Sequence, residues 1–188
     1  ALPRMPRASP STATGPRDHL ERQLTSLWEK ILHVRPVHPS DNFFDLGGHS
    51  FAAVRLIAEI HKLTGKNLPL ATLFQAATVE SLAKILRSSG PSSWSVLVPI
   101  NPRGSKPPLF LVHGAEGNLL LYRQLVQYLG PDQPVYGLQS QGLSGEQAFL
   151  RNVEEMAVSY LKEIVALQPE GPYLVGGYCL GGVVALEI

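Results

Sequence analysis

Two short strings in the chain place a nucleophilic side chain beside paired glycines. DNFFDLGGHS, residues 41–50, ends in Ser50, and LVGGYCLGG, residues 174–182, contains Cys179, the only cysteine of the sequence. A serine hydroxyl can carry a covalently attached group, and a cysteine thiolate can attack a carbonyl carbon. The sequence therefore predicts two chemically different sites in two different parts of the chain.

The string around Cys179 has the layout of a nucleophile elbow. A short apolar run passes into glycines, as in a strand that turns sharply into a helix, and the pattern G-x-S-x-G has cysteine in place of serine. Gly177 and Gly181 lie two residues from Cys179, where a side chain would collide across the turn, and Gly176 and Gly182 would widen that allowance. A helix N-terminus favours the thiolate of a cysteine. The alternative is a buried structural cysteine beside a glycine-rich packing contact.

The string that ends in Ser50 predicts a loop followed by a helix. Phe43 and Phe44 could attach the loop to a small core, and Gly47 and Gly48 allow backbone conformations that are closed to other residues. Ser50 would then begin the helix with its hydroxyl exposed, where the helix dipole and free backbone N–H groups favour a phosphodiester. For a serine considered alone, the simpler interpretation is a helix N-cap.

Hydrophobic spacing predicts a small helical unit around the first string. A first amphipathic helix ends before Pro36. A second helix runs from Ser50 to Gly65, followed by a helical turn at residues 71–75 and a last helix capped by Thr78. The expected inward-facing residues are Leu20, Leu24, Leu27, Trp28 and Ile31 in the first helix, Val54, Ile57, Ile60 and Leu63 in the second, and Leu82, Ile85 and Leu86 in the last.

After residue 94 the pattern changes to short apolar strands that alternate with helices. The expected strands are 96–100, 109–114, 134–139 and 172–177, and the expected helices are 119–130, 153–168 and one that begins near 183. This alternation predicts a mostly parallel α/β sheet. The fold class expected for the whole chain is therefore multidomain, with a four-helix all-α bundle followed by an α/β domain.

Composition narrows the range of partners. The 188 residues carry a net charge of +1, from 16 basic and 15 acidic side chains, and 44% of them are hydrophobic. This balance predicts no nucleic-acid or membrane partner, and no apolar run reaches the roughly 18–20 residues of a membrane span. A single cysteine and the lack of a secretory signal at the N-terminus lead us to expect a cytoplasmic protein.

The first string resembles the core motif of peptidyl carrier domains of nonribosomal peptide synthetases. That motif reads Asp-x-Phe-Phe-x-Leu-Gly-Gly-(His/Asp)-Ser. The matching positions are Asp41, Phe43, Phe44, Leu46, Gly47, Gly48, His49 and Ser50. The resemblance implies that a phosphopantetheinyl transferase loads Ser50 with 4′-phosphopantetheine from coenzyme A, and that Asp45, Gly48 and His49 lie beside the attached arm.

The second part of the chain resembles an α/β-hydrolase thioesterase of the type that follows a terminal carrier. LFLVHGAEGN, residues 109–118, resembles the first oxyanion loop of that family. The family pattern implies oxyanion-hole N–H groups at Ala115 and at Leu180, the residue after the nucleophile. His113 is not expected to be the catalytic base, because in this fold the base follows the nucleophile. The family's acid and histidine would lie beyond Ile188.

These resemblances divide the chain into four expected segments. They are a linker from an upstream adenylation domain at 1–16, a carrier domain at 17–88, a linker with the first strand region at 89–108, and a thioesterase domain at 109–188, truncated after the elbow. The opening letters ALP resemble the end of the lysine-bearing motif that closes adenylation domains.

The function implied is that of the terminal carrier–thioesterase segment of a nonribosomal peptide synthetase. Ser50 would carry a peptidyl thioester that passes to Cys179 and is released by hydrolysis or cyclisation, and the adenylation and condensation domains of the same assembly line would be partners. Two alternatives stay open: an acyl chain from a polyketide or hybrid line, or an α/β domain that only docks the carrier and holds an inert Cys179.

Overall fold

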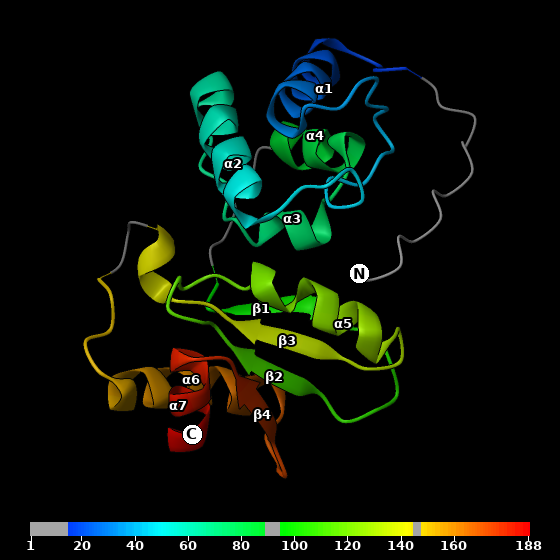
Figure 1. Cartoon of the computed structure of the whole chain (residues 1–188). Helices are drawn as coiled ribbons and strands as arrows, with labels where there is room; N and C mark the ends of the chain where they lie inside the picture. The colour runs from blue at the N-terminus through cyan, green and yellow to red at the C-terminus, as the bar shows by residue number, and fades with distance from the viewer. Residues whose placement is uncertain (1–14, 89–94, 145–147) are drawn as a thin grey trace. The chain divides into compact units, whose positions relative to one another are not determined.

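The computed structural model describes residues 15–88, 95–144 and 148–188 (Figure 1). The linker expected at 1–16 falls outside these ranges except for its last two residues. Within the described ranges, none of the helices combines the length and the apolar composition that are needed to cross a membrane.

The described residues form two compact units. One unit contains 15–66 and 76–88, and the other contains 67–75, 95–144 and 148–188. The four helices expected in the first part of the chain are all present: α1 (His19–Leu32), α2 (Ser50–Thr64), the short α3 (Thr72–Gln75) and α4 (Val79–Arg87).

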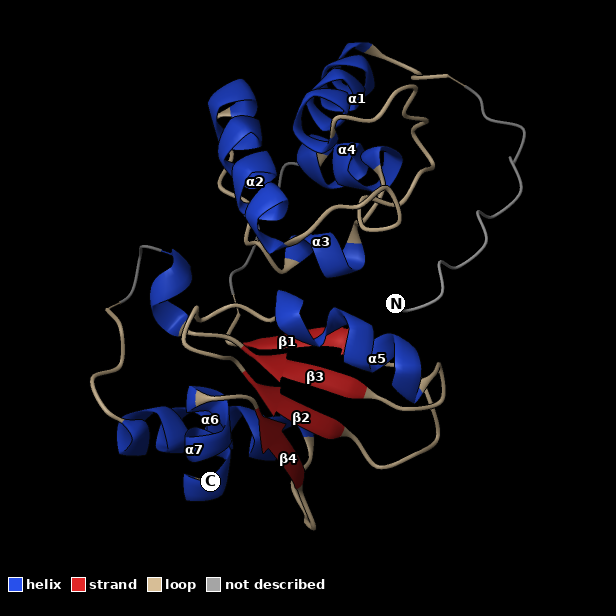
Figure 2. Cartoon of the chain, in the orientation of Figure 1, coloured by secondary structure: helices blue, strands red, loops and turns tan. Residues whose placement is uncertain are grey.

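The second unit is built on a four-stranded, mostly parallel sheet, as predicted (Figure 2). The strands are β1 (Leu97–Asn101), β2 (Leu109–Val112), β3 (Val135–Leu138) and β4 (Leu174–Gly177), in the spatial order β1-β3-β2-β4. β2 pairs in parallel with both β3 and β4, whereas β1 is antiparallel to β3. The carboxyl ends of β2 and β4 consequently meet at the same edge of the sheet.

Helices cover both faces of this sheet. One face is covered by η1 (Leu120–Tyr122) and α5 (Arg123–Leu129), and the other by α6 (Val153–Leu167) and α7 (Leu180–Glu187). A further short helix, η2 (Gln141–Ser144), follows β3. Side chains of β2 alternate between the faces, so Phe110 and Val112 pack with Tyr160 of α6 and Val184 of α7, while Leu111 packs on the side of α5. The two layers of helices hold the ends of β2 and β4 in place from both sides.

In the first unit α1 packs against both α2 and α4 (Figure 1). The buried side chains of this core are Leu24, Trp28, Ile31, Phe43, Ala52, Ala53, Leu56, Ile60, Val79, Leu82, Ala83 and Leu86. The amphipathic pattern expected for α1 is confirmed at Leu24, Trp28 and Ile31, and Thr78 caps α4 as expected.

The expected inner face of α2 was partly wrong. Val54 is 52% exposed and Leu63 is 40% exposed, whereas Ala52, Leu56 and Ile60 are buried. Two residues along an α-helix turn the side chain by roughly 200°, so a stripe through Ala52, Leu56 and Ile60 places Val54 on the opposite side. The outer face of α2 therefore carries exposed apolar side chains close to Ser50.

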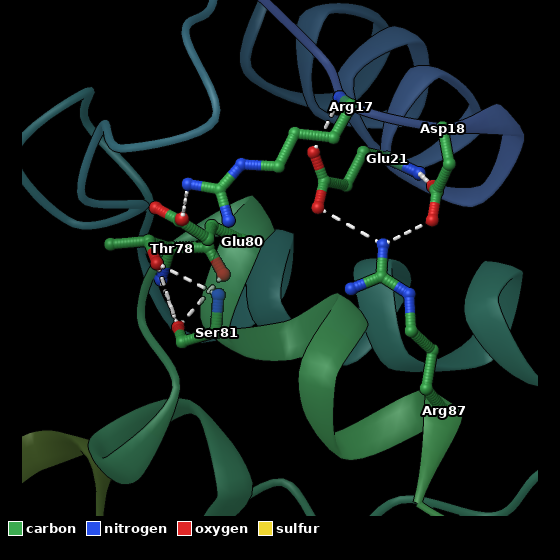
Figure 3. A network of polar contacts seen from close by, with 7 residues as sticks. All are labelled: Arg17, Asp18, Glu21, Thr78, Glu80, Ser81 and Arg87. Carbon is green, nitrogen blue, oxygen red and sulfur yellow. Dashed lines mark hydrogen bonds and ion pairs between the residues drawn. The ribbon is translucent and has the colours of Figure 1, made fainter. Parts of the chain in front are cut away.

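A polar network joins the two ends of the first unit's sequence (Figure 3). Asp18 caps α1 by accepting a hydrogen bond from the backbone N–H of Glu21 at 2.9 Å. Arg87 at the end of α4 donates to Glu21 Oε1 at 3.0 Å and to Asp18, and the backbone N–H of Arg17 donates to Glu21 Oε2 at 2.7 Å. Glu21 is only 1% exposed, so it is a buried carboxylate whose two oxygens are both hydrogen-bonded.

This environment sets the protonation of Glu21. Burial raises the pKa of its carboxyl group, but the hydrogen bonds from the Arg17 N–H and the Arg87 guanidinium outweigh burial and hold the pKa below its ordinary value. Because the pKa is lower in the folded chain than in the unfolded chain, ionised Glu21 stabilises the fold at pH values above the ordinary carboxyl pKa. That stabilisation is lost as the pH falls through the folded-state pKa.

We expect Glu21→Gln to lower the free energy of unfolding of the first unit by about 1–3 kcal/mol near neutral pH, because Arg87 loses a buried charged acceptor. The difference between the two proteins should shrink on acidification, as Glu21 of the wild type becomes protonated. Urea unfolding at several pH values, followed by the fluorescence of Trp28 in a Trp94→Phe background, measures both effects.

Glu80→Gln is the matched control. Glu80 forms an ion pair with Arg17 in which both side chains are substantially exposed, and such pairs contribute about 0–1 kcal/mol. Equal losses in the two variants, or a loss in Glu21→Gln that does not change with pH, would contradict the role assigned to the buried carboxylate.

Candidate functional site

Phe43 attaches the loop before Ser50 to the core of the first unit. Its side chain is fully buried and meets Trp28 edge-on, with 5.1 Å between ring centroids. The backbone N–H of Phe43 donates to the carbonyl of Ala77 at 2.7 Å, and Phe44 packs edge-on against the Phe43 ring. The expected role of the two phenylalanines is confirmed, and the loop is held on both its side-chain and backbone sides.

The two glycines of this loop are needed for different reasons. Gly47 takes a φ of 95°, which favours glycine, as expected. Gly48 has no positive φ; a Cβ at this position would lie 2.4 Å from the Phe43 ring. The explanation expected for Gly48 was therefore wrong, because close packing and not an unusual conformation excludes a side chain there. Asp45 is exposed on the same loop.

His49, not Ser50, caps α2. Its Nδ1 accepts the backbone N–H of Ala52 at 3.4 Å, and its carbonyl accepts that of Ala53 at 2.9 Å. The N-cap interpretation of Ser50 was therefore wrong: Ser50 is the first residue of the helix, and its side chain is exposed. Within the described part of the chain, neither the Ser50 hydroxyl nor the N–H groups of Ser50 and Phe51 have a hydrogen-bond partner.

Cys179 lies in the turn from β4 to α7, with its backbone at φ 55° and ψ −119°. A residue with a side chain adopts such a positive φ only at an energetic cost of roughly 1–3 kcal/mol. The side chain is exposed and reduced. The N–H groups of Gly181 and Gly182 donate to the carbonyls of Tyr178 and Cys179, each at 3.0 Å, so the helix begins directly behind the thiol.

The glycines around Cys179 confirm a tight strand-to-helix turn. A Cβ at Gly177 would lie 2.1 Å from the backbone of Gly181, and a Cβ at Gly181 would lie 2.4 Å from the Val112 carbonyl oxygen. Gly182 is also tight, at 3.3 Å from the Gly177 oxygen, but a Cβ at Gly176 would make an ordinary 3.6 Å contact. Gly182 therefore widens the allowance for the turn, as expected, whereas the same expectation for Gly176 was wrong.

Sheet register brings Ala115 and Leu180 to the same edge. Val112 and Gly177 are partners in the parallel β2–β4 pair. Ala115 lies three residues after Val112, and Leu180 lies three residues after Gly177. The two loops approach one another, since a Cβ on Gly114 would lie 3.9 Å from the Tyr178 oxygen. Within the described residues, neither the Ala115 nor the Leu180 N–H donates a hydrogen bond, so both donors are open.

His113 is buried behind this edge and is only 2% exposed. Its Nδ1 lies 2.6 Å from the carbonyl oxygen of Gly114 and its Nε2 lies 2.7 Å from the hydroxyl of Tyr160. A carbonyl only accepts, so Nδ1 carries the proton and Nε2 accepts from Tyr160. Burial lowers the pKa of the imidazole, which favours this neutral form. Neither ring nitrogen is free to serve Cys179.

Tyr122 is a residue at this edge that sequence reasoning missed. Its hydroxyl donates to the carbonyl of Val112 at 2.6 Å and accepts the backbone N–H of Tyr178 at 2.8 Å. A tyrosine in an apolar helical string gives no sign of such a contact, which depends on the pairing of distant segments. The side chain of Asp132 lies in an exposed turn, where its carboxylate accepts hydrogen bonds from Ser105.

No group of three or more metal-ligating side chains gathers in the ranges that the structure describes. Ser50 presents an exposed hydroxyl at a helix start with open N–H groups, and Cys179 presents an exposed thiol beside two open N–H groups.

Comparison with known proteins agrees with this division. A family model described as a phosphopantetheine attachment site matches residues 22–86, and a thioesterase domain model matches residues 107–188. A dimodular nonribosomal peptide synthase from Bacillus subtilis (strain 168) is 42% identical over 183 residues, which are 97% of this chain and 8% of the relative. Malpinin synthetase from Mortierella alpina is 42% identical over 173 residues, which are 90% of this chain and 2% of the relative.

A solved structure supports the same assignment. Holo-AB3403, a four-domain nonribosomal peptide synthetase crystallised with AMP and glycine, matches the whole chain with a TM-score of 0.54 and 36% identity, over 14% of its own length. This chain thus spans less than a tenth of the two curated relatives and about a seventh of the solved structure. The chain belongs to the nonribosomal peptide synthetase family, in which it forms a phosphopantetheine-carrying domain followed by part of a thioesterase domain.

Proposed function

We propose that Ser50 carries the peptidyl chain as a thioester and that Cys179 accepts it, after which hydrolysis or cyclisation releases the product. The observation that carries the proposal is the backbone at Cys179. A strained φ of 55° at the junction of a parallel strand and a helix exposes the thiol at the sheet edge where two loops with open N–H groups meet.

The geometry at Ser50 fits a covalently attached phosphodiester. The hydroxyl is exposed, and the unpaired N–H groups of Ser50 and Phe51 at the positive end of the α2 dipole are suited to an anionic oxygen. 4′-Phosphopantetheine supplies a flexible arm that ends in a thiol. His49 fixes the start of the helix by capping it, Gly48 permits the close packing of the loop, and exposed Asp45 is retained as a residue beside the arm.

The outer face of α2 supports a role in binding partner proteins. Phe51 is 75% exposed and Val54 is 52% exposed, next to the loading site. Exposed apolar side chains at a site that must be reached by other proteins are typical of interaction surfaces. We assign this face to the phosphopantetheinyl transferase, which uses coenzyme A, and to the adenylation and condensation domains of the same assembly line.

Cys179 is the proposed acyl acceptor. Its thiolate attacks the carbonyl carbon of the incoming thioester, a new C–S bond forms, the old C–S bond breaks, and the departing thiolate takes up a proton. Exchange of one thioester for another is close to balanced in free energy, whereas a serine would form a less activated oxygen ester. The acyl group on Cys179 therefore stays reactive toward water or toward an internal amine or hydroxyl.

Ala115 and Leu180 are the proposed oxyanion donors. The attack converts the carbonyl oxygen into an oxyanion, and two fixed N–H groups stabilise that charge without reorganisation during the reaction. The shared position of the two residues, three beyond the Val112–Gly177 pair, supports this assignment. Loss of one such donor typically costs about 10²–10³ in rate.

Within the described residues, neither His113 nor Asp132 is placed to accept the proton of the thiol. His113 is the only histidine after His61, and both of its ring nitrogens are engaged. Asp132 is the only aspartate after Asp45 and is bound to Ser105. The share of the reaction that we assign to this chain is therefore the nucleophile and the oxyanion donors.

Incubation with coenzyme A and a phosphopantetheinyl transferase should add one phosphopantetheine group per chain, and Ser50→Ala should abolish the addition. Intact-protein mass spectrometry measures the gain. His49→Ala should slow loading without abolishing it, because it removes a cap that stabilises the start of α2 by about 1 kcal/mol but leaves the hydroxyl in place.

Ser26→Ala, at an exposed serine of α1, is the control for loading and should be loaded like the wild type. The carrier assignment is wrong if the wild type gains no mass, or if Ser50→Ala gains as much as the wild type.

Cys179→Ala should abolish covalent acylation at position 179 by a peptidyl thioester, because no thiol remains at that position to accept the acyl group. Cys179→Ser should be acylated more than about tenfold more slowly, since an unactivated hydroxyl is a weaker nucleophile than a thiolate. It should also give a lower ratio of cyclised to hydrolysed product. Trapped acyl-enzyme and released products are both measured by mass spectrometry.

The acylation experiment also tests the alternative in which the α/β domain only docks the carrier. A wild-type protein that is loaded on Ser50 but never acylated on Cys179 would favour an α/β domain that only docks the carrier. A Cys179→Ser variant that released the same products at the same rates would contradict the specific advantage that we assign to cysteine.

A further inference from the structure

We propose that Tyr122 is a positioning residue for the acyl transfer, because its hydroxyl joins the loop that bears the Cys179 thiol to the strand end that leads into the oxyanion loop. The inference rests on the proposed function of Cys179.

The hydroxyl of Tyr122 forms hydrogen bonds to the backbone on each side of the site, while its ring packs in the core with Leu111 and Leu119. The hydroxyl donates to the carbonyl of Val112 at 2.6 Å and accepts the N–H of Tyr178 at 2.8 Å. Val112 is the last residue of β2, and Tyr178 immediately precedes Cys179. One oxygen atom therefore bridges the two chain segments from which the proposed site is built.

The bridge requires a neutral phenol in one orientation. A carbonyl can only accept, so the single O–H of Tyr122 points to Val112 and a lone pair receives the N–H of Tyr178. The side chain is only 4% exposed, and burial raises the pKa of the phenol although the bond from Tyr178 opposes this. The hydroxyl thus stays protonated over the working range of pH and keeps both bonds.

The hydroxyl bridge lies just beyond the last residue pair of β2 and β4, where it fixes the two loops relative to one another. β-Sheet pairing ends at Val112 and Gly177, so the next residues of the two loops are beyond the ladder. The Tyr178 N–H is the first backbone donor after that ladder, and the Tyr122 hydroxyl accepts its hydrogen bond. The hydroxyl thereby extends the coupling of the strands by one step, toward Cys179 and the open N–H groups of Ala115 and Leu180.

Loss of the hydroxyl should loosen the relative placement of thiol and oxyanion donors while the strands stay paired. Misplacement of reacting groups by about 1 Å can cost about 10²-fold in rate. Alkylation of a thiol by iodoacetamide has no oxyanion to stabilise and needs no such alignment. The two reactions of Cys179 should therefore respond differently to Tyr122→Phe.

The experiment compares these two reactions in the whole protein. Acylation of Cys179 by an acyl N-acetylcysteamine thioester and alkylation by iodoacetamide are followed by mass spectrometry. Tyr122→Phe should acylate about 10- to 100-fold more slowly than the wild type, while its alkylation rate stays within about twofold. Equal loss of both rates, or loss of neither, would overturn the positioning role.

Tyr136→Phe is the matched control. Tyr136 lies in β3 of the same sheet and stacks on Phe110, and its hydroxyl has no hydrogen bond within the described residues. It should keep both rates. A loss of acylation in Tyr136→Phe as large as in Tyr122→Phe would mean that any hydroxyl removed from the sheet has this effect, and the proposal would fail.

A second measurement does not depend on catalysis. In ¹H–¹⁵N spectra of the whole protein, the amide signals of Tyr178, Leu180 and Ala115 should shift in Tyr122→Phe and stay in place in Tyr136→Phe. A wild type that is never acylated would overturn the proposed function of Cys179 alone. Unchanged amide signals in Tyr122→Phe would overturn the role of Tyr122 whatever the outcome for Cys179.

Discussion

The parallel pairing of β2 with β4, in the register that sets Val112 beside Gly177, is the constraint on which the second unit depends. It forces the start of α7 against the end of β2, so closely that a Cβ at Gly181 would lie 2.4 Å from the Val112 oxygen. A shift in register would separate the loop that bears Cys179 from the loop that bears Ala115. The glycines are therefore required by packing of backbone on backbone, and the strain at Cys179 is maintained by the strands and helix around it.

Ser50 and Cys179 both lie at the start of a helix, but their backbones and their helix caps differ. At Ser50 the backbone is ordinary helix, and the histidine before it supplies the cap, so the hydroxyl is exposed without strain. At Cys179 the residue itself is the N-cap, has a positive φ and makes no side-chain capping bond. In the proposed reaction Ser50 only holds a group and can tolerate an unactivated setting, whereas Cys179 attacks a carbonyl carbon and benefits from an exposed position at the turn.

Most of the secondary structure, and the strings around Ser50 and Cys179, could be predicted from the sequence. The spacing of hydrophobic residues, the spacing of glycines and the helix caps are all local signals. The errors have physical causes. Val54 was assigned to the wrong face of α2 because apolar residues occur on both sides of that helix. His49 replaced Ser50 as the cap because a histidine ring can accept from the helix N-terminus. Tyr122 could not be found at all, since its two partners lie 10 and 56 residues away in the sequence.

The identity of the nucleophile fits the residues that surround it. A serine at an elbow needs a neighbouring base, because its hydroxyl is a weak nucleophile until a proton is removed, whereas a cysteine thiol is already ionised to a few per cent near neutral pH. In residues 95–188 the only histidine is bonded to Gly114 and Tyr160. In the proposed reaction, cysteine therefore depends less than serine would on a base from elsewhere, and the thioester that it forms keeps the reactivity that release requires.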